Sequence, residues 1–562
     1  MNSRSQGWWL VLLVLAAATV LRLRGLEREL PHLPEPDSYM VMQAQILREG
    51  REPDLKQSEK GYYAYPLLLA QGLALLPEAK AEASAPLEEH LAAASADAVR
   101  SRTLVAWLSL LFIPATWLLA RRFTTPLGAL IAAAFAATSL LHLEFSQQAR
   151  HHAPHASFAL LTVLAALQLR ERPDWVRYLV AAGLALLALG MLHSGWFALL
   201  PILAAHALRE KREERANSVA ILLPIAACVL AWTTLYPHEA ENMNPEASWA
   251  AGGHTFHWRD LDLSGFAVAT RLLWDYDPGL SVAAFLGLVF TLVGARAKWR
   301  GLDAGAKRQL LVALAYAVPY GLALCVYKET CDRMLLPLVP FLATLGGIGV
   351  VALALKMPQA LRAGVLGLAL AVPTLGAVRY AAVRDADDTF EQAAQWIEEH
   401  STGRAMLCAR FALPLASDAK ALELVRTDHA TRQKRWVRYQ LDRLDANGAA
   451  LPGARDLIPM PGRLFVGQDP AKAQARLEKF VADEAPEWVL IEVSKYTRIN
   501  PLMMQLRDWA TAHGTLSATF HGEPEGRAME PALDYQDVAH LFWRLLSADA
   551  FGPTLELYHI TR

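Results

Sequence analysis

Long runs of apolar residues constrain the fold of this 562-residue chain more than any other feature of its sequence. A helix needs roughly 20 apolar residues to cross the hydrocarbon core of a bilayer. Runs approaching that length recur up to about residue 380, and 54% of the chain is hydrophobic. We therefore expect about eleven transmembrane helices, at residues 8–21, 103–120, 127–142, 153–169, 178–192, 196–208, 219–236, 280–294, 310–327, 334–355 and 361–378. The first run has signal-peptide features, but the number of later runs favours an uncleaved anchor.

Basic residues predict how these helices are oriented. Lys and Arg gather in alternate connections, at 121–122, 170–177, 209–215, 296–308 and 356, and short basic loops stay cytoplasmic. We expect a multi-pass protein of the plasma or inner membrane with a cytoplasmic N-terminus. Residues 27–101, 143–152, 237–278, 328–333 and everything after 379 would then be external, or periplasmic. Arg22 and Arg24 break the pattern. A net charge of −1 argues against a nucleic-acid partner.

The composition changes to that of a soluble domain after residue 385. Residues 389–400 have the pattern of an amphipathic helix. Short apolar runs predict strands at 405–408, 464–466, 488–493, 516–520 and 555–560, with helices at 471–481 and 501–513 between them. The predicted fold is a polytopic α-helical membrane protein with a C-terminal soluble α/β domain. Residues 1–380 would form the transmembrane domain, with 27–101 as a first external loop carrying surface helices, and residues 385–562 the external domain.

Two carboxylates, Glu35 and Asp37, follow the first apolar run. Asp37 begins a predicted amphipathic helix that ends at Arg48, so its simplest role is to cap that helix after Pro36. A capping carboxylate can also face a cleft, and the two roles are compatible. The stretch Trp274-Asp275-Tyr276-Asp277 is expected to cap the following apolar helix, which begins near Pro278.

Basic side chains mark the expected outer ends of other runs. Arg150 lies in the loop 143–152, and Lys328 and Arg333 flank the turn 328–333. Guanidinium groups bind phosphate in a bidentate manner, and cations at this depth suit a lipid phosphate. Simple interfacial anchoring would explain them equally well. Cys325 and Cys331 would pair in an oxidising compartment or remain free.

Histidines provide further candidates. His151, His152 and His155 offer ligands for a divalent metal, although their spacing matches no standard metal motif. His254 and His257 lie in the long loop 237–278, among glycines and aromatic residues. Such a loop suits a segment that covers a polar substrate, and equally a solvated loop on lipid headgroups.

Four short motifs carry a resemblance to a known superfamily. They are Glu35-Pro36-Asp37-Ser38-Tyr39, Tyr63-Ala64-Tyr65-Pro66-Leu67, Ala149-Arg150-His151-His152-Ala153-Pro154, and the Arg-x-x-x-Pro-x-x-Pro pattern from Arg333 to Pro340. With these, residues 1–380 resemble the GT-C membrane glycosyltransferases, especially bacterial relatives of the protein O-mannosyltransferases of family 39. The chain is more distantly similar to the oligosaccharyltransferase catalytic subunit. It lacks that protein's second acidic motif, so no cofactor is expected to be required and a divalent metal is not favoured.

The resemblance implies sugar transfer, hexosyl or pentosyl, from a polyprenyl-phosphate-linked donor to a protein, lipid or glycan acceptor on the external face, with inversion. Asp37 would be the general base and Glu35 would orient it. Arg333, with Lys328 or Arg150, would bind the donor phosphate in the membrane lipid, and the substrate-loop candidates are Tyr65, His254 and His257. The alternative is a transporter or flippase with an external binding domain. Transporters place ionisable residues near the bilayer midplane and often show internal repeats; here such residues gather at the outer ends of the runs.

Overall fold

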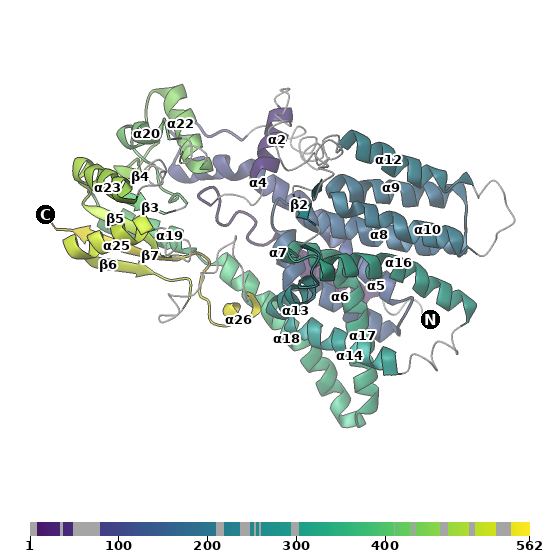
Figure 1. Ribbon diagram of the computed structural model, residues 1–562. Coiled ribbons are helices and arrows are strands. Elements are labelled where there is room, and N and C mark those ends of the chain that lie inside the picture. The colour runs from purple at the N-terminus through teal and green to yellow at the C-terminus, as the bar shows by residue number, and fades with distance from the viewer. Residues whose placement is uncertain are drawn as a thin grey trace. The chain divides into compact units, whose positions relative to one another are not determined.

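The structure is a computed structural model, shown in Figure 1. It describes residues 8–33, 38–48, 79–209, 219–235, 248–251, 254–257, 260–293, 303–409, 411–428, 431, 434–460, 470–493, 501–523 and 541–561. Glu35, Asp37 and Tyr65, and the strand expected at 464–466, lie outside the described residues.

The chain forms two compact units. The first unit comprises Met1–Leu26, Tyr39–Leu76 and Ser101–Val378, and the second comprises Glu27–Ser38, Pro77–Arg100 and Arg379–Arg562. The second unit therefore contains two pieces of the expected first external loop as well as the C-terminal part of the chain.

The first unit is built mainly of helices. Their bounds are α1 Trp8–Leu23, α5 Phe112–Ala120, α6 Pro126–Thr138, α7 Leu140–Ser146, α8 His152–Glu171, α9 Trp175–Met191, η1 His193–Ala198, α10 Leu199–Ala207, α12 Leu222–Leu235, α13 Gly265–Tyr276, α14 Pro278–Val293, α16 Ala304–Val326, η3 Asp332–Leu338 and α17 Val339–Lys356. Three further helices, α2 Ser38–Arg48, α4 Leu87–Leu110 and α18 Gln359–Asp385, include residues at the boundaries between the units. Strands β1 Ser248–Ala251 and β2 His254–His257 form an antiparallel hairpin.

Small residues allow helices of the first unit to pack closely. A Cβ atom on Gly287 of α14 would lie 1.9 Å from the carbonyl oxygen of Leu345 in α17. A Cβ atom on Gly347 of α17 would lie 2.2 Å from the carbonyl oxygen of Gly128 in α6. Glycine at such positions lets helix backbones approach each other, which is a common means of packing helices within membranes.

Five described helical stretches, three of which join two consecutive helices, are long and apolar enough to cross a membrane: Leu87–Ala120, His152–Glu171, Ala304–Val326, Asp332–Lys356 and Gln359–His400. The pair α6 and α7, bent by 50° at its break, makes up to six. Shorter apolar helices lie at Trp8–Leu23, Trp175–Met191, Leu222–Thr234 and Pro278–Val293. The expected count of about eleven is not confirmed, because several apolar runs fold as short or broken helices.

A five-stranded sheet organises the second unit. Its strands are β3 Ala405–Cys408, β4 Leu457–Pro459, β5 Trp488–Val493, β6 Gly514–Phe520 and β7 Thr554–Ile560, in the order β4-β3-β5-β7-β6. Strand β3 is parallel to β4 and β5, whereas β7 is antiparallel to β5 and β6. The described helices of this unit also include α19 Thr389–His400, α20 Ala419–Val425, α22 Arg435–Asn447, α23 Pro470–Glu484, α25 Pro501–His513 and α26 Leu541–Leu545.

Alternating side chains give this sheet a core on each face. Leu407 and Leu490 pack with Phe390 and Ile397 of α19. The neighbouring residues Met406 and Val489 belong to a separate cluster that includes residues of α23 and α25. Because successive residues of a strand point to opposite faces, helices cover both sides of the sheet (Figure 1).

Candidate functional site

A break between α6 and α7 is the structural centre of the candidate site. Arg22, fully buried at the end of α1, donates from Nη1 to the carbonyl oxygen of Ala137 (3.0 Å) and from Nη2 to that of Ala136 (3.3 Å). Its Nη2 also lies 3.0 Å from Nδ1 of His142 in α7. The last carbonyl groups of a helix have no partner within the helix and carry partial negative charge. Arg22, which contradicts the expected charge pattern, thus caps the end of α6.

Asp277 holds the other side of the break. Its Oδ1 accepts from the backbone N–H of Leu140 (2.7 Å) and its Oδ2 accepts from Oγ of Ser139 (2.6 Å). A carboxylate is favourable at the N-terminus of a helix for the converse electrostatic reason. The side chain of Asp277 therefore caps α7 and not the helix that begins at Pro278, so the expectation that the stretch 274–277 caps that helix is wrong for this residue. The sequence around Asp277 does not indicate that the N-terminus of α7, more than a hundred positions earlier in the chain, lies within its reach.

Further hydrogen bonds fasten the turns that follow this break. Gln147 donates from Nε2 to the carbonyl oxygens of Leu21 (2.8 Å) and Arg24 (3.0 Å), which ties the turn after α7 to the end of α1. Beside Asp277, the hydroxyl of Tyr276 donates to Oδ2 of Asp332 (2.9 Å). Oδ1 of Asp332 accepts from the backbone N–H of Arg333 (2.7 Å). The start of η3 is thereby tied to the end of α13.

Arg150 and Arg333 both lie within electrostatic range of two other side chains, those of Cys331 and His152. Burial raises the pKa of the Cys331 thiol, and Arg333 and Arg150 are both close enough to act on it in the opposite direction. The ring of His152 also lies within the electrostatic range of both guanidinium groups. Arg150 lies over the ring of Phe145, 5.8 Å from its centroid. The guanidinium of Arg333, which is half-buried, makes no hydrogen bond or ion pair with the side chains that the structure describes. Two cations gathered in this way suit a phosphate.

The side chain of Lys328, unlike that of Arg333, forms an ion pair with a described carboxylate. Its Nζ lies 2.7 Å from Oδ1 of the buried Asp260, and its backbone N–H donates to the carbonyl oxygen of the same residue (2.8 Å). The charge of Lys328 is thus already balanced by a carboxylate. It is therefore a weaker candidate for a phosphate than Arg333.

His151, which precedes α8, and His152 and His155 in its first turns do not gather around a common point. His155 Nδ1 lies 3.0 Å from the carbonyl oxygen of Ala188, and its Nε2 lies 3.3 Å from Oγ of Ser194. His151 and His152 stack on each other with ring centroids 4.1 Å apart. Binding of a metal by these residues stays a prediction.

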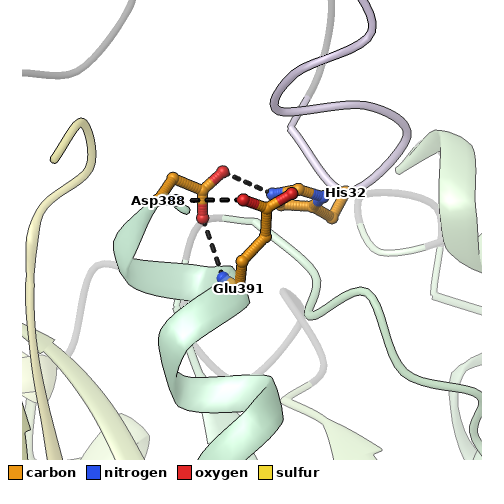
Figure 2. A group of neighbouring side chains, drawn as sticks. All are labelled: His32, Asp388 and Glu391. Carbon is orange, nitrogen blue, oxygen red and sulfur yellow. Dashed lines mark hydrogen bonds and ion pairs between the residues drawn. The ribbon is translucent and has the colours of Figure 1, made fainter. Parts of the chain in front are cut away.

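The structure places other side chains where a metal would find ligands. Among the described residues, His32, Asp388 and Glu391 of the second unit form a group whose ligand atoms all lie within 4.8 Å of one another (Figure 2). Nothing in the sequence pattern pointed to His32, which lies 356 positions before Asp388.

The substrate-loop candidates His254 and His257 lie in β2, where their backbones pair with those of Ala251 and Ser248 in β1.

No family model matches the chain and no curated protein does. Among solved structures, the chain is similar to an oligosaccharyltransferase from Archaeoglobus fulgidus tethered with an acceptor peptide (12% identity, TM-score 0.46, covering 87% of this chain and 69% of that one). It is also similar to the oligosaccharyltransferase AglB of the same organism in complex with an inhibitory peptide and a dolichol-phosphate (11%, 0.47, 91% and 72%).

A further similar structure is ArnT from Cupriavidus metallidurans bound to undecaprenyl phosphate (12% identity, TM-score 0.41, covering 99% of this chain and 98% of that one). Similarity at these values assigns neither an activity nor a residue role to this chain.

Proposed function

We propose that this chain is an integral-membrane glycosyltransferase. It moves a hexosyl or pentosyl group from a polyprenyl-phosphate-linked donor to an acceptor at the external face, with inversion of the anomeric centre. The observation that carries the proposal is that the guanidinium groups of Arg150 and Arg333 both lie within electrostatic range of His152 and Cys331. Two cations held among apolar helices suit an anion whose remaining part is a hydrocarbon chain.

Arg333 is the principal ligand of the donor phosphate, and Arg150 assists it. As the bond between the anomeric carbon and the phosphate oxygen breaks, negative charge accumulates on the departing polyprenyl phosphate. Cations already in place stabilise that charge without reorganisation during the reaction. Lys328 has the smallest share, since its charge is balanced by Asp260.

Asp37 is the general base, a role that rests on the resemblance of its motif. The acceptor hydroxyl oxygen forms a bond to the anomeric carbon on the face opposite the phosphate, and its proton passes to Asp37. Glu35 orients Asp37. Tyr65, His254 and His257 contact the sugar or the acceptor, and no metal is required.

The acceptor is a hydroxyl of a protein, a lipid or a glycan. The second unit assists in binding it on the external side of the plasma or inner membrane. Its sheet has helices on both faces and offers loops at the strand ends, which is where proteins of mixed α/β architecture commonly bind ligands.

Sugar transfer by purified protein in lipid nanodiscs tests the proposal. Radiolabelled polyprenyl-phosphate sugars serve as donors, and transfer to extracted membrane glycans, lipids and peptides is measured. We expect Asp37→Asn to abolish transfer, and Arg333→Gln to lower it about 100-fold or more, as loss of a charge-stabilising donor does in other enzymes. Lys328→Gln removes the same charge five residues away and is the matched control; it should lower transfer less than about tenfold.

Three outcomes contradict the proposal. Full activity of Asp37→Asn would show that Asp37 is not the general base. Equal losses of activity in the Arg333 and Lys328 variants would show that Arg333 is not the principal ligand of the donor phosphate. Translocation of the lipid-linked sugar across the nanodisc or vesicle membrane without any transfer would favour the transporter or flippase.

A further inference from the structure

Helix α26 carries apolar residues on its exposed side and a charged residue on its buried side. Trp543 is 39% exposed, and Leu546, which directly follows the helix, is 46% exposed. They are three positions apart, so they lie on one side of the helix. Arg544, between them in the sequence, is only 5% exposed and forms an ion pair with Glu523. This is the reverse of the distribution expected for a helix whose outer side faces water.

Exposed apolar side chains are rare elsewhere in the described part of the second unit. Apart from Trp543 and Leu546, Leu516 of β6 is the one large hydrophobic side chain there that is exposed. Hydrophobic residues scattered singly over a surface are normal, whereas contiguous ones mark contacts with other proteins or with membranes. Leu516 is therefore an ordinary surface residue, and the pair on α26 indicates a surface that contacts a partner.

Arg544 gives a second indication about the surroundings of α26. Long charged side chains at a protein surface normally bring their charge to water. The guanidinium group of Arg544 instead turns inward, and its Nη1 and Nη2 are buried without a hydrogen-bond partner among the described residues. Burying these donors is unfavourable when water is within reach. The inward position is explained if the outer side of the helix faces an apolar medium.

The position of α26 identifies that medium. Residues 359–378 of α18 belong to a stretch long and apolar enough to cross a membrane, and Leu368 and Leu375 within it are exposed. About 20 helical residues span roughly 30 Å, which is the thickness of the hydrocarbon core of a bilayer. Arg379, the next residue, therefore lies where α18 leaves the hydrocarbon core.

Arg379 holds α26 at this level. Its Nε donates to the carbonyl oxygen of Leu545 (3.1 Å), and its Nη2 donates to that of Ala548. The last carbonyl groups of a helix have no partner within the helix, and a cation beside them is favourable. The rings of Tyr380 and Phe551 also pack together, with their centroids 5.8 Å apart. The segment that begins with α26 is thus fastened to the residues of α18 that directly follow its apolar part.

We propose that α26 is a membrane anchor: Trp543 and Leu546 insert into the lipid leaflet that α18 reaches at Arg379. Tryptophan is enriched at the boundary between headgroups and acyl chains, because its ring is apolar and its N–H is polar. Leu546 adds apolar area that an interfacial helix buries against the acyl chains. Arg544 and its ion pair with Glu523 stay on the protein side. The anchor acts whether or not the chain transfers sugar, so the inference goes beyond the proposed function.

A protein partner is the competing occupant of this surface. Stable protein interfaces bury about 800 Å² on each partner, which is far more than two side chains of a short helix provide. A bilayer sets no such requirement, because the adjoining apolar surface of α18 already lies in it. The continuity of these two apolar surfaces favours lipid.

Spin labels on the full-length protein in lipid nanodiscs test the anchor. Leu546→Cys places a label on the proposed anchor, and Leu516→Cys, at an exposed leucine of the same unit, is the matched control. Wild-type protein treated in the same way gives the background from its own four cysteines. Oxygen dissolves preferentially among acyl chains, whereas a charged nickel chelate stays in water. We expect the ratio of collisions with oxygen to collisions with the chelate to be several-fold higher at position 546 than at position 516.

Two results would overturn the inference. Equal ratios at positions 546 and 516 would show that α26 faces water. Low collision rates with both reagents at position 546 would show that a protein covers it.

Tryptophan fluorescence supplies a second measurement, with a variant that keeps an aromatic ring on α26. In nanodiscs whose lipids carry bromine on the acyl chains, bromine quenches the emission of tryptophans that lie near those chains. We expect Trp543→Phe to lower the quenched part of the emission. Trp509→Phe, on α25 of the same unit, is the control and should lower only the part that bromine does not quench. An unchanged quenched part in Trp543→Phe would contradict the anchor.

Neither measurement uses sugar transfer. A failure of the anchor is therefore distinguishable from a failure of the proposed function, in which Asp37→Asn keeps full activity.

Discussion

Two helix ends, one in each unit, hold neighbouring parts of the same stretch of chain by opposite means. The C-terminal end of α6 binds the side chain of Arg22, whose donors reach backbone carbonyl groups and His142. The N-terminal end of α19 is capped by Asp388, which binds His32 only ten residues further along the chain. Arginine keeps its charge throughout the neutral range, whereas histidine does not. The first anchor is thus permanent and the second adjustable, although both are buried hydrogen bonds at helix ends.

Removing the permanent anchor should have the largest effect. Arg22→Ala leaves the carbonyl groups of Ala136 and Ala137 without their partner in a buried site, and we expect a loss of about 3 kcal/mol or more in the free energy of unfolding. Thermal unfolding in detergent measures it. Arg22→Lys, which keeps the charge but not the fork of donors, should recover part of the loss. A change below about 0.5 kcal/mol would mean that the contact does not stabilise the break.

Removing Asp388, the capping residue of α19, should have the second largest effect on stability. Asp388→Ala removes the acceptor for the N–H groups of Phe390 and Glu391 and leaves His32 buried without its partner. We expect a loss of about 2 kcal/mol, measured by hydrogen exchange in peptides of the second unit. Asp388→Asn keeps an oxygen for capping and should lose less. Equal losses in the two variants would show that the charge adds nothing to the cap.

Removing Asp277, which caps α7 on the other side of the break in the first unit, should destabilise the protein less. Asp277→Ala removes the cap of α7, with an expected loss of about 1 kcal/mol, while Asp277→Asn should retain roughly half of the stabilisation because its amide oxygen can still accept. Scanning calorimetry of the purified protein compares the two variants. If Asp277→Ala lost as much stability as Arg22→Ala, the arginine would not be the stronger of the two caps at the break.

The pH dependence should be the smallest effect and the one that separates the two anchors. Because the pKa values of His32 and Glu391 are raised, raising the pH from about 6 to about 8 should weaken the second anchor by up to about 1 kcal/mol. Exchange in peptides of α19 measures this. Peptides from α6 and α7 provide the internal control, since Arg22 stays charged. A similar pH response in both regions would contradict the contrast between a permanent anchor at Arg22 and a pH-dependent anchor at His32.

Local patterns in the sequence predicted local elements well. Residues 389–400, 405–408 and 488–493 form α19, β3 and β5 with the expected bounds, because their amphipathic or apolar character is decided within a few neighbours. The number of spans was less predictable. Residues 196–208, expected as one span, form the short helices η1 and α10, and where a helix breaks depends on which caps other segments supply.

For the candidate site, the sequence supplied expectations about which residues lie on the same side of the membrane. The alternation of basic loops assigned Arg150 and Arg333 to the same side of the membrane, and the structure brings both within range of Cys331. That Lys328 would be paired with Asp260 was not predictable, since the two residues lie far apart in the chain and nothing in either neighbourhood specifies the other.

What the sequence alone determined is therefore the membrane-helical character of the first part of the chain, four of the five described strands of the second unit's sheet (β4 was not expected), and the types of residue available for binding a phosphate. These depend on apolar runs, alternation and side-chain chemistry, which can be read over a short window. Only the tertiary structure decided that Arg22 and Asp277 close the two sides of one helix break and that His32 meets Asp388. Such contacts join segments more than a hundred positions apart, and buried charges find their partners only when the surrounding helices have packed.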